Sequence, residues 1–154
     1  MDPHSGSHDM IIRNNTVHEN GKMGIICSGN CRSIIIEANN VYNNVGSGIA
    51  FSIDMQYSIV RNNTIFNQTN TEDVEDDIKY NGISISESSN NMVYDNKISD
   101  SDIGIYIRKD SSDNHIYDNV ISEIKSYATQ VESLDSLDNV FVGNYIDNSE
   151  HIVK

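Results

Sequence analysis

The chain has 154 residues, one proline, no tryptophan and 37% apolar residues, which suffices for one domain with a continuous core but not for two. Leucine and alanine are scarce while isoleucine, valine and asparagine are frequent, so the composition disfavours helices and favours strands. The formal net charge of -13 argues against nucleic acid as a partner, and no apolar run approaches the roughly 20 residues of a membrane helix.

The negative charge is unevenly distributed along the chain. Residues 1–66 carry 4 basic and 5 acidic side chains, a net of -1, and residues 67–154 carry the remaining 6 basic and 18 acidic ones, a net of -12. An anionic ligand therefore meets the least repulsion in the N-terminal half. A simpler interpretation is that the acidic residues keep a repetitive fold with open edges soluble.

Two short signatures recur with the same spacing. A Gly-Ile pair begins at Gly24, Gly48, Gly82 and Gly104. Asparagine followed two residues later by valine or isoleucine begins at Asn15, Asn39, Asn63, Asn96, Asn119 and Asn144, at intervals of 24, 24, 33, 23 and 25 residues. Both series share the single long interval. One repeat of about 24 residues with one insertion of about ten explains both.

Each repeat is expected to contain three short strands. The first follows the Gly-Ile glycine, at Ile25–Cys27, Ile49–Phe51, Ile83–Ile85 and Ile105–Ile107. The second precedes the repeated asparagine, at Ser33–Glu37, Tyr57–Arg61, Asn91–Tyr94, His115–Tyr117 and Asn139–Val142, and the third spans the valine or isoleucine after it. Strands this short are stable only when stacked. The pattern predicts an all-β, right-handed parallel β-helix of five to six rungs, about 4.8 Å apart.

The repeated asparagines and glycines are expected at bends. An asparagine amide can bond to the backbone of its own turn and to the amide of the next rung, which predicts an asparagine ladder. A glycine supplies a bend that needs either a positive φ or no side chain. A leucine-rich repeat needs more leucines than Leu134 and Leu137, and a β-sandwich would not keep a 24-residue register through an insertion.

The insertion and the cysteines leave several interpretations open. The acidic, non-alternating segment from Asn67 to Lys79 predicts a loop near 67–80 within a single domain, 1–154. It resembles a calcium loop in composition only, because the ligand spacing is absent.

Cys27 and Cys31 are compatible with unpaired thiols, a local disulfide or a metal site, although two thiols are too few ligands for a metal alone. No cofactor is predicted.

The N-terminal residues fit the same register. A period of 24 places Met1 over Ile25, so alternation sends Met1 and Pro3 inward and Asp2 and His4 outward. Two outward columns follow. One contains Asp2, Ile26, Ala50, Ser84 and Tyr106, and the other contains His4, Ser28, Ser52, Ser86 and Arg108. A wall lined with hydroxyl groups, with an aromatic ring and a basic group at one end, suits an extended sugar chain.

The Asp-Pro-His strand, followed by H-D-M-I-I-R-N-N-T-V-H and then G-I-I-C-S, resembles the mannuronan C-5-epimerases. These are parallel β-helix enzymes with carbohydrate-binding and sugar-hydrolase repeats. The resemblance implies that His4 is the base that removes the uronate C5 proton, with Asp2 orienting it or contacting the sugar. Such a step needs a base that titrates near neutrality and a donor or cation to stabilise the carbanion. Reprotonation on the other face gives epimerisation, and loss of the 4-O-linked sugar gives a lyase.

This sequence departs from the family pattern in three ways. The family has Tyr-Gly before the apolar residue of this strand, and an arginine on the next rung, where this chain has Gly29. Arg32 would have to replace that arginine. The rungs that would precede residue 1, with their cationic residues, are also missing. The resemblance therefore implies a C-terminal fragment of a longer protein or a product with a late start, and leaves open whether it is active as it stands. The residues expected to bind substrate are Ser28, Arg32, Ser52, Ser86, Tyr106 and Arg108.

The expected partner is a polysaccharide of the polyuronate type, which places the protein outside the cell or in the periplasm. Two other functions stay open: a non-catalytic carbohydrate-binding module and a structural cell-surface solenoid. End rungs without a cap also predict end-to-end association of copies.

Overall fold

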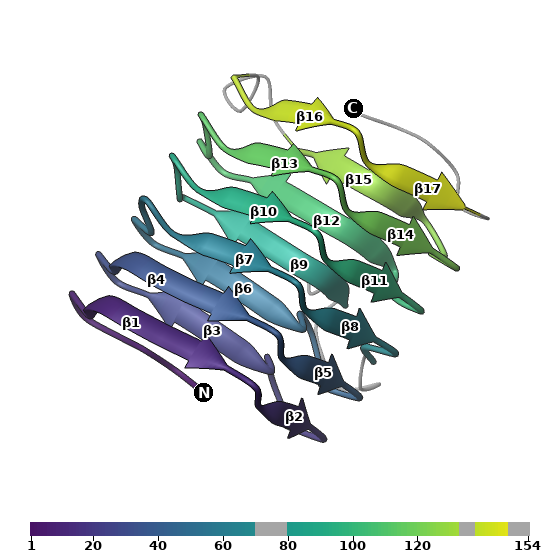
Figure 1. The fold of residues 1–154 in the computed structure, drawn as a ribbon, viewed down its shortest axis with the longest axis horizontal. Coiled ribbons are helices and arrows are strands. Elements are labelled where there is room, and N and C mark those ends of the chain that lie inside the picture. The colour runs from purple at the N-terminus through teal and green to yellow at the C-terminus, as the bar shows by residue number, and fades with distance from the viewer. Residues whose placement is uncertain (70–79, 133–137, 148–154) are drawn as a thin grey trace.

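The computed structural model describes residues 1–69, 80–132 and 138–147. Within these ranges the regular elements are seventeen strands and no helix, wound into successive rungs of one coil (Figure 1). Nothing in this part of the chain forms a helix long and apolar enough to cross a membrane. The prediction of an all-β parallel solenoid is confirmed.

The strands form three parallel sheets, with sheets B and C in front and sheet A behind them in Figure 1. Sheet A contains β3 Ile25–Ser28, β6 Ile49–Ser52, β9 Asn81–Ser86, β12 Ile103–Arg108 and β15 Tyr127–Val131. Sheet B contains β1 His8–Arg13, β4 Arg32–Glu37, β7 Ile59–Arg61, β10 Met92–Tyr94, β13 His115–Tyr117 and β16 Val140–Val142. Sheet C contains β2 Thr16–His18, β5 Asn40–Tyr42, β8 Thr64–Phe66, β11 Lys97–Ser99, β14 Val120–Ser122 and β17 Tyr145–Asp147.

The register between rungs follows the predicted period. Ile25 pairs with Ile49, and Ile49 pairs with Ile83, so the long interval is absorbed without a shift of register. Residues 67–69 still follow the coil, because Thr69 donates its backbone N–H to the Asn44 carbonyl oxygen. Residues 70–79, with the expected loop and the calcium interpretation of that segment, lie outside the described residues.

The core is a stack of inward-facing isoleucine and valine side chains from all three sheets. Ile25, Ile49 and Ile83 from sheet A and Ile36 and Val60 from sheet B are at most 1% exposed. Each buried aliphatic side chain of this size contributes roughly 1.5–3 kcal/mol to folding. Because every rung offers the same kind of surface to the next, the repeat of the sequence becomes one continuous core.

The asparagine ladder lies at the bend between sheets B and C, as expected. Asn63 is typical: its Nδ2 donates to the Arg61 carbonyl of its own turn and to Asn96 Oδ1 of the next rung, at 3.0 Å each. Its Oδ1 accepts from the backbone N–H and Nδ2 of Asn39, at 2.9 and 3.0 Å. This pattern satisfies groups that would otherwise be buried without partners, and it links each rung to the next.

Two further ladders were not expected from the sequence. Ser58, Asn91, Asn114 and Asn139 form one at the bend before sheet B. Asn20, Asn44 and Gln68 form another after sheet C. The intervals of Asn91, Asn114 and Asn139 are 23 and 25 residues, so the same spacing could have revealed the first of these ladders.

The Gly-Ile glycines are needed for space and not for a left-handed backbone. The glycines with positive φ are Gly6, Gly29, Gly46 and Gly143. A Cβ at Gly82 would lie 2.3 Å from Ile98 Cγ2 and 2.7 Å from the Gly104 carbonyl oxygen. Of the two expected reasons for glycine, the absence of a side chain is therefore the correct one.

Candidate functional site

The first residues lie alongside β3 at the edge of sheet A, where an isolated bridge at His4 takes the place of a further strand. His4 pairs in parallel with Ser28, and the Ser28 backbone N–H donates to the Pro3 carbonyl at 3.2 Å. The Ile26 N–H donates to the Met1 carbonyl at 2.9 Å, which sets Asp2 beside Ile26. The predicted 24-residue register of the Asp-Pro-His strand is therefore confirmed.

The two outward columns of sheet A continue along the wall as predicted. Ser28 pairs with Ser52, Ser52 with Ser86, and Ser86 with Arg108. At about 4.8 Å per rung, the column from His4 to Arg108 spans about 19 Å. A long polymer could follow this wall, whereas His4 and Arg108 are too far apart to act on one sugar residue.

The wall is less open than the alternation of side chains suggests. Ser28 is 7% exposed, and its Oγ lies 2.7 Å from His4 Nδ1. Tyr106 is only 6% exposed, and its hydroxyl donates to Glu132 Oε1 at 2.9 Å. Tyr106 therefore offers little ring surface for a sugar, in contrast to the expectation from sequence. Period and alternation give the direction of a side chain but not what packs beside it.

Glu132 organises the far end of the sheet A wall, and sequence reasoning did not find it. Its second carboxylate oxygen lies 3.7 Å from Arg108 Nε, and the Arg108 guanidinium lies 5.8 Å from the centre of the Tyr106 ring. The carboxylate thus neutralises part of the cation expected to meet a sugar carboxylate. A residue 24 positions after Arg108 lies one rung above it, so the repeat could have suggested this pair.

His4 borders a hollow of about 570 Å³ at the first rung, lined by Met1, Asp2, Pro3, His4, Ser7, Met10 and Ile12. Asp2 and His4 are exposed, while Ile12 belongs to the buried core. In the tautomer whose Nδ1–H donates to Ser28 Oγ, the His4 Nε2 lone pair is left to accept a proton. Such an imidazole can act as a base if a substrate lies against the wall.

Arg32 does not share the wall with His4. It opens β4 in sheet B, where its neighbours in register are His8 and Gln56. The turn Gly29–Asn30–Cys31 separates it from Ser28 at the end of sheet A. The expectation that Arg32 replaces the family arginine beside the base is not supported by this position. Arg32 instead belongs to a pocket at the corner between the sheets.

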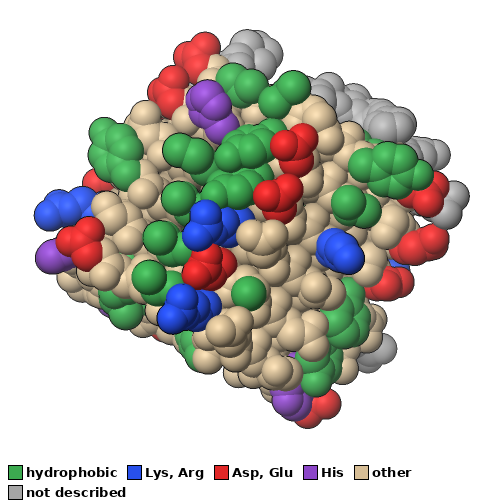
Figure 2. Space-filling view, in the orientation of Figure 1, with side chains coloured by type: hydrophobic (Ala, Val, Ile, Leu, Met, Phe, Trp, Pro, Cys, Tyr) green, Lys and Arg blue, Asp and Glu red, His purple; other side chains and the backbone are tan. Residues whose placement is uncertain are grey.

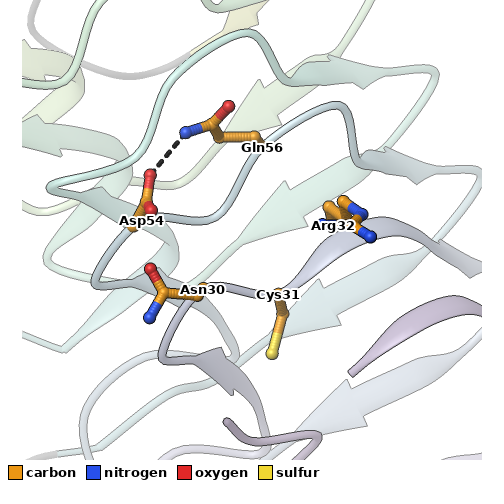
Figure 3. A pocket seen from close by; sticks show the side chains of 5 residues that line it. All are labelled: Asn30, Cys31, Arg32, Asp54 and Gln56. Atoms are coloured by element: carbon orange, nitrogen blue, oxygen red, sulfur yellow. Dashed lines mark hydrogen bonds between the residues drawn. The ribbon is translucent and has the colours of Figure 1, made fainter. Parts of the chain in front are cut away.

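This corner pocket has a volume of about 230 Å³ and is lined by Asn30, Cys31, Arg32, Asp54 and Gln56 (Figure 3). Figure 3 shows Asn30 and Asp54 on one side and Arg32 on the other, with the Gln56 amide hydrogen-bonded to the Asp54 carboxylate. The lining comes from two successive rungs: Asn30, Cys31 and the first residue of β4, Arg32, belong to one, and Asp54 and Gln56, between β6 and β7, belong to the next. Asn30, Asp54 and Gln56 were not predicted as site residues.

The cysteines belong to the core. Cys27 and Cys31 are both free thiols with no exposed surface, and the Cys31 thiol lies 3.2 Å from the Ser28 carbonyl oxygen. Burial, assisted by the neighbouring Cys31, raises the pKa of the Cys27 thiol to about 12. Of the three interpretations left open, the structure has unpaired thiols. Across residues 1–69, 80–132 and 138–147, no three histidine, cysteine or acidic side chains gather as a metal site would require.

The outer face of sheet B has a different character. One column runs Arg13, Glu37, Arg61, Tyr94 and Tyr117, and Figure 2 shows basic, acidic and apolar side chains following one another across this face. Arg61 lies 2.7 Å from Glu37, and it donates to the Tyr94 hydroxyl at 3.0 Å. Tyr94 stacks on Tyr117 with ring centres 4.7 Å apart. Because the two rings stack on each other, the faces between them are closed to a sugar.

Comparison with known proteins agrees with the fold. The family model described as "Right handed beta helix region" matches residues 4–153. This chain belongs to that family. The predicted hand of the β-helix is thereby confirmed. No curated protein matches the β-helix chain in sequence.

Solved structures with the same fold include two alginate-modifying enzymes and a phage protein. The A-module of mannuronan C-5 epimerase AlgE4 from Azotobacter vinelandii is 15% identical, with a TM-score of 0.84 over 99% of this β-helix and 45% of that chain. The periplasmic alginate epimerase AlgG is 22% identical, with a TM-score of 0.77 over 98% of this chain and 41% of that one.

The enzymatically active domain of tailspike protein 2 from bacteriophage CBA120 is 11% identical, with a TM-score of 0.62 over 98% of this chain and 22% of that one. This β-helix thus spans less than half the length of each of these three proteins. At such identities the likeness concerns the fold.

Proposed function

We propose that this β-helix binds an acidic polysaccharide of the uronate type along the outer wall of sheet A and acts on it as an epimerase or lyase. His4 is the base for the C5 proton, and Asp2 orients the sugar or the base. The observation that carries the proposal is the pairing of His4 with Ser28, which puts an exposed imidazole at one end of a column of serine hydroxyls. The fold shared with two alginate epimerases supports it.

The chemistry assigns different tasks to different parts of the wall. His4 Nε2 would take the proton, while the Ser28 hydroxyl holds Nδ1 at 2.7 Å. Ser52 and Ser86 would contact sugar units farther along the polymer, and Arg108 would meet a carboxylate about 19 Å from His4. A substrate of this kind is found outside cells, so we place the protein in the periplasm or outside the cell.

One observation favours a second function, non-catalytic binding of polysaccharide. The cation of the His4 column is Arg108, four rungs away, and it is already near Glu132. A carbanion next to His4 would therefore lack an adjacent cation on that column. A structural role in a cell-surface solenoid, and association of copies end to end, stay predictions.

Exchange of the C5 proton tests the catalytic proposal. A mannuronate-rich polymer is incubated with the protein in D2O, and deuterium at C5 is measured by NMR. We expect exchange with the unaltered chain and a loss of at least a hundredfold in His4→Ala. His8→Ala is the matched control, since His8 is also exposed but contacts Asp9 at 2.8 Å. If C5 proton exchange persists in His4→Ala, His4 is not the base.

Retention of the chain on immobilised polyuronate separates binding from catalysis. Retention without any C5 exchange would favour the non-catalytic alternative. If the chain shows neither retention on polyuronate nor C5 exchange, only the structural role would be left.

A further inference from the structure

The corner pocket lies beside two residues whose backbone conformation is unfavourable. Ile53 and Tyr57 have φ of 59° and 52°, in the left-handed region that L-residues with bulky side chains avoid. Among the residues that the structure describes, they are the one β-branched and the one aromatic residue with positive φ. Ile53 directly precedes Asp54 and Tyr57 directly follows Gln56, so both are chain neighbours of residues that line the pocket.

The other rungs place small or polar residues at the same two positions. In register with Ile53 are Ser5, Gly29, Glu87 and Lys109. In register with Tyr57 are Ser33 and Asn90. These residues also have positive φ, and glycine and asparagine adopt it most readily. The corner itself therefore demands neither an isoleucine nor a tyrosine.

Burial does not explain these two side chains either. Ile53 is 52% exposed and Tyr57 is 62% exposed, so neither fills the core. A bulky residue in a strained conformation that gains no burial is a candidate for contact with a ligand. Together they place an aliphatic and an aromatic side chain on the solvent side of this one rung.

Arg32 adds a free cation to the same corner. Its side chain is exposed, and within residues 1–69, 80–132 and 138–147 it makes no ion pair or side-chain hydrogen bond. Arg13, Arg61 and Arg108 all lie within 4.0 Å of a glutamate. In a chain of net charge -13, an arginine left without a carboxylate is available to an anionic ligand.

We propose that the corner pocket formed by Asn30, Arg32, Asp54 and Gln56, with Ile53 and Tyr57 beside it, binds one carboxylated sugar residue. The Arg32 guanidinium takes the carboxylate, and the Asp54, Gln56 and Asn30 side chains take ring hydroxyl groups. Tyr57 and Ile53 meet the apolar face of the pyranose. The volume of about 230 Å³ suits a single sugar unit, because sites for drug-sized ligands measure about 300–1,000 Å³.

The ligand class rests on the proposed function, while the place of the site does not. The pocket follows Ser28 and Ser52 at the corner where sheet A ends. A polymer that lies against the sheet A wall could therefore send one residue or a branch around the corner to Arg32. The pocket would then anchor the polymer without taking part in the proton transfer at His4.

The test is the affinity of the chain for a mannuronate tetramer, measured by calorimetry, with mannotetraose as the neutral probe. We expect Arg32→Gln and Tyr57→Asn each to weaken binding of the acidic tetramer about tenfold, the loss expected for one charge-assisted contact or one aromatic contact. The neutral probe should bind about tenfold more weakly than the acidic one, and Arg32→Gln should abolish that difference.

Two control variants match the changes without touching the pocket. Lys97→Gln removes another cation that has no ion pair among the described residues, and Tyr145→Asn removes another tyrosine that is 62% exposed. Both should change the affinity less than twofold. Tyr57→Asn should also keep or raise Tm, because asparagine adopts positive φ more readily than tyrosine, so weaker binding would not reflect unfolding.

The proposal is overturned if the tetramer binds equally well to the chain and to both pocket variants, or if it does not bind at all. The two proposals can fail independently. Binding that depends on Arg32, without any C5 exchange, would support the pocket and refute His4 as the base. C5 exchange that depends on His4, with binding unaffected by Arg32→Gln and Tyr57→Asn, would support the base and refute the pocket.

Discussion

At the bend between sheets B and C, all six rungs have an asparagine at the same position. At the bend after sheet A, by contrast, five rungs have five different residue types at one position. The first bend has Asn15, Asn39, Asn63, Asn96, Asn119 and Asn144. The second has Ser5, Gly29, Ile53, Glu87 and Lys109, all with positive φ.

The two bends differ in what their side chains must do. At the first bend the four inner asparagines, Asn39, Asn63, Asn96 and Asn119, are buried, and they satisfy backbone groups that no water reaches. At the second, backbone hydrogen bonds between rungs hold the turn: the Ile53 N–H, for example, donates to the Ser86 carbonyl at 3.2 Å. The side chain there is free to vary, so variation at this corner can serve a ligand without disturbing the coil.

Removal of one central asparagine should have the largest effect on stability. In Asn63→Ala, the carbonyls of Ile36 and Arg61 and the N–H of Asn39 lose their amide partner in a buried region. We expect the free energy of unfolding to fall by about 3 kcal/mol or more, since each unsatisfied buried group costs roughly 1–3 kcal/mol. Urea denaturation measures it. Asn40→Ala, at an exposed position of β5, should change it by less than about 0.5 kcal/mol.

Addition of a methyl group at the Gly-Ile turn should have the second-largest effect on stability. In Gly82→Ala the new Cβ would lie 2.3 Å from Ile98 Cγ2, so the rung must shift. We expect a loss of roughly 1–3 kcal/mol, as for other overpacked cores, measured by thermal or urea unfolding. Gly21→Ala is the control, because no atom lies within 4 Å of its Cβ. Equal stability of the two variants would show that the contact between rungs is not tight.

The buried thiol should make stability fall at high pH. The pKa of Cys27 is about 12 in the folded chain against an ordinary value of 9.0, so only the unfolded chain ionises between these values. From pH 9 upward, unfolding becomes easier by about 1.4 kcal/mol per pH unit from this group. Urea titrations at pH 8, 9 and 10 should show this slope, and Cys27→Ala should lack it. Identical slopes in the two proteins would contradict the burial of the thiol.

Replacement of the strained isoleucine should have the smallest effect, with the opposite sign. Ile53→Asn relieves a left-handed backbone at a half-exposed position, so we expect a gain of about 1 kcal/mol in the free energy of unfolding. Thermal unfolding monitored by circular dichroism would detect it. A marked loss of stability would mean that Ile53 packs against the coil and is not held there for a ligand.

Much of the fold could be predicted because inward residues repeat. The Gly-Ile and asparagine intervals predicted the register, the strands of the central rungs and the columns that join His4 to Arg108, but not β1. The Gly-Ile signature did not predict β15, because this strand has Ala128 at the position where the other rungs have glycine. The ladders through Asn91 and Asn44 were not predicted, although Asn91, Asn114 and Asn139, and Asn20 and Asn44, also recur at the interval of the repeat.

The candidate site was harder to predict, for a physical reason. Inward side chains meet the same environment in every rung, so period and alternation are enough to place them. The surroundings of outward side chains depend on corners and on partners from other rungs. Glu132 covers Tyr106, and the turn after Ser28 carries Arg32 from the sheet A wall to sheet B.

The sequence by itself determined the coil, its core, one asparagine ladder and the outward position of Asp2 and His4, since each follows from a 24-residue period with alternating side chains. Only the tertiary structure decided which outward residues are open to a ligand. It brought Arg32, Asp54 and Gln56 together at one corner, and it showed Ile53 and Tyr57 held in left-handed turns there, because the backbone path at a bend is set by the contacts between successive rungs.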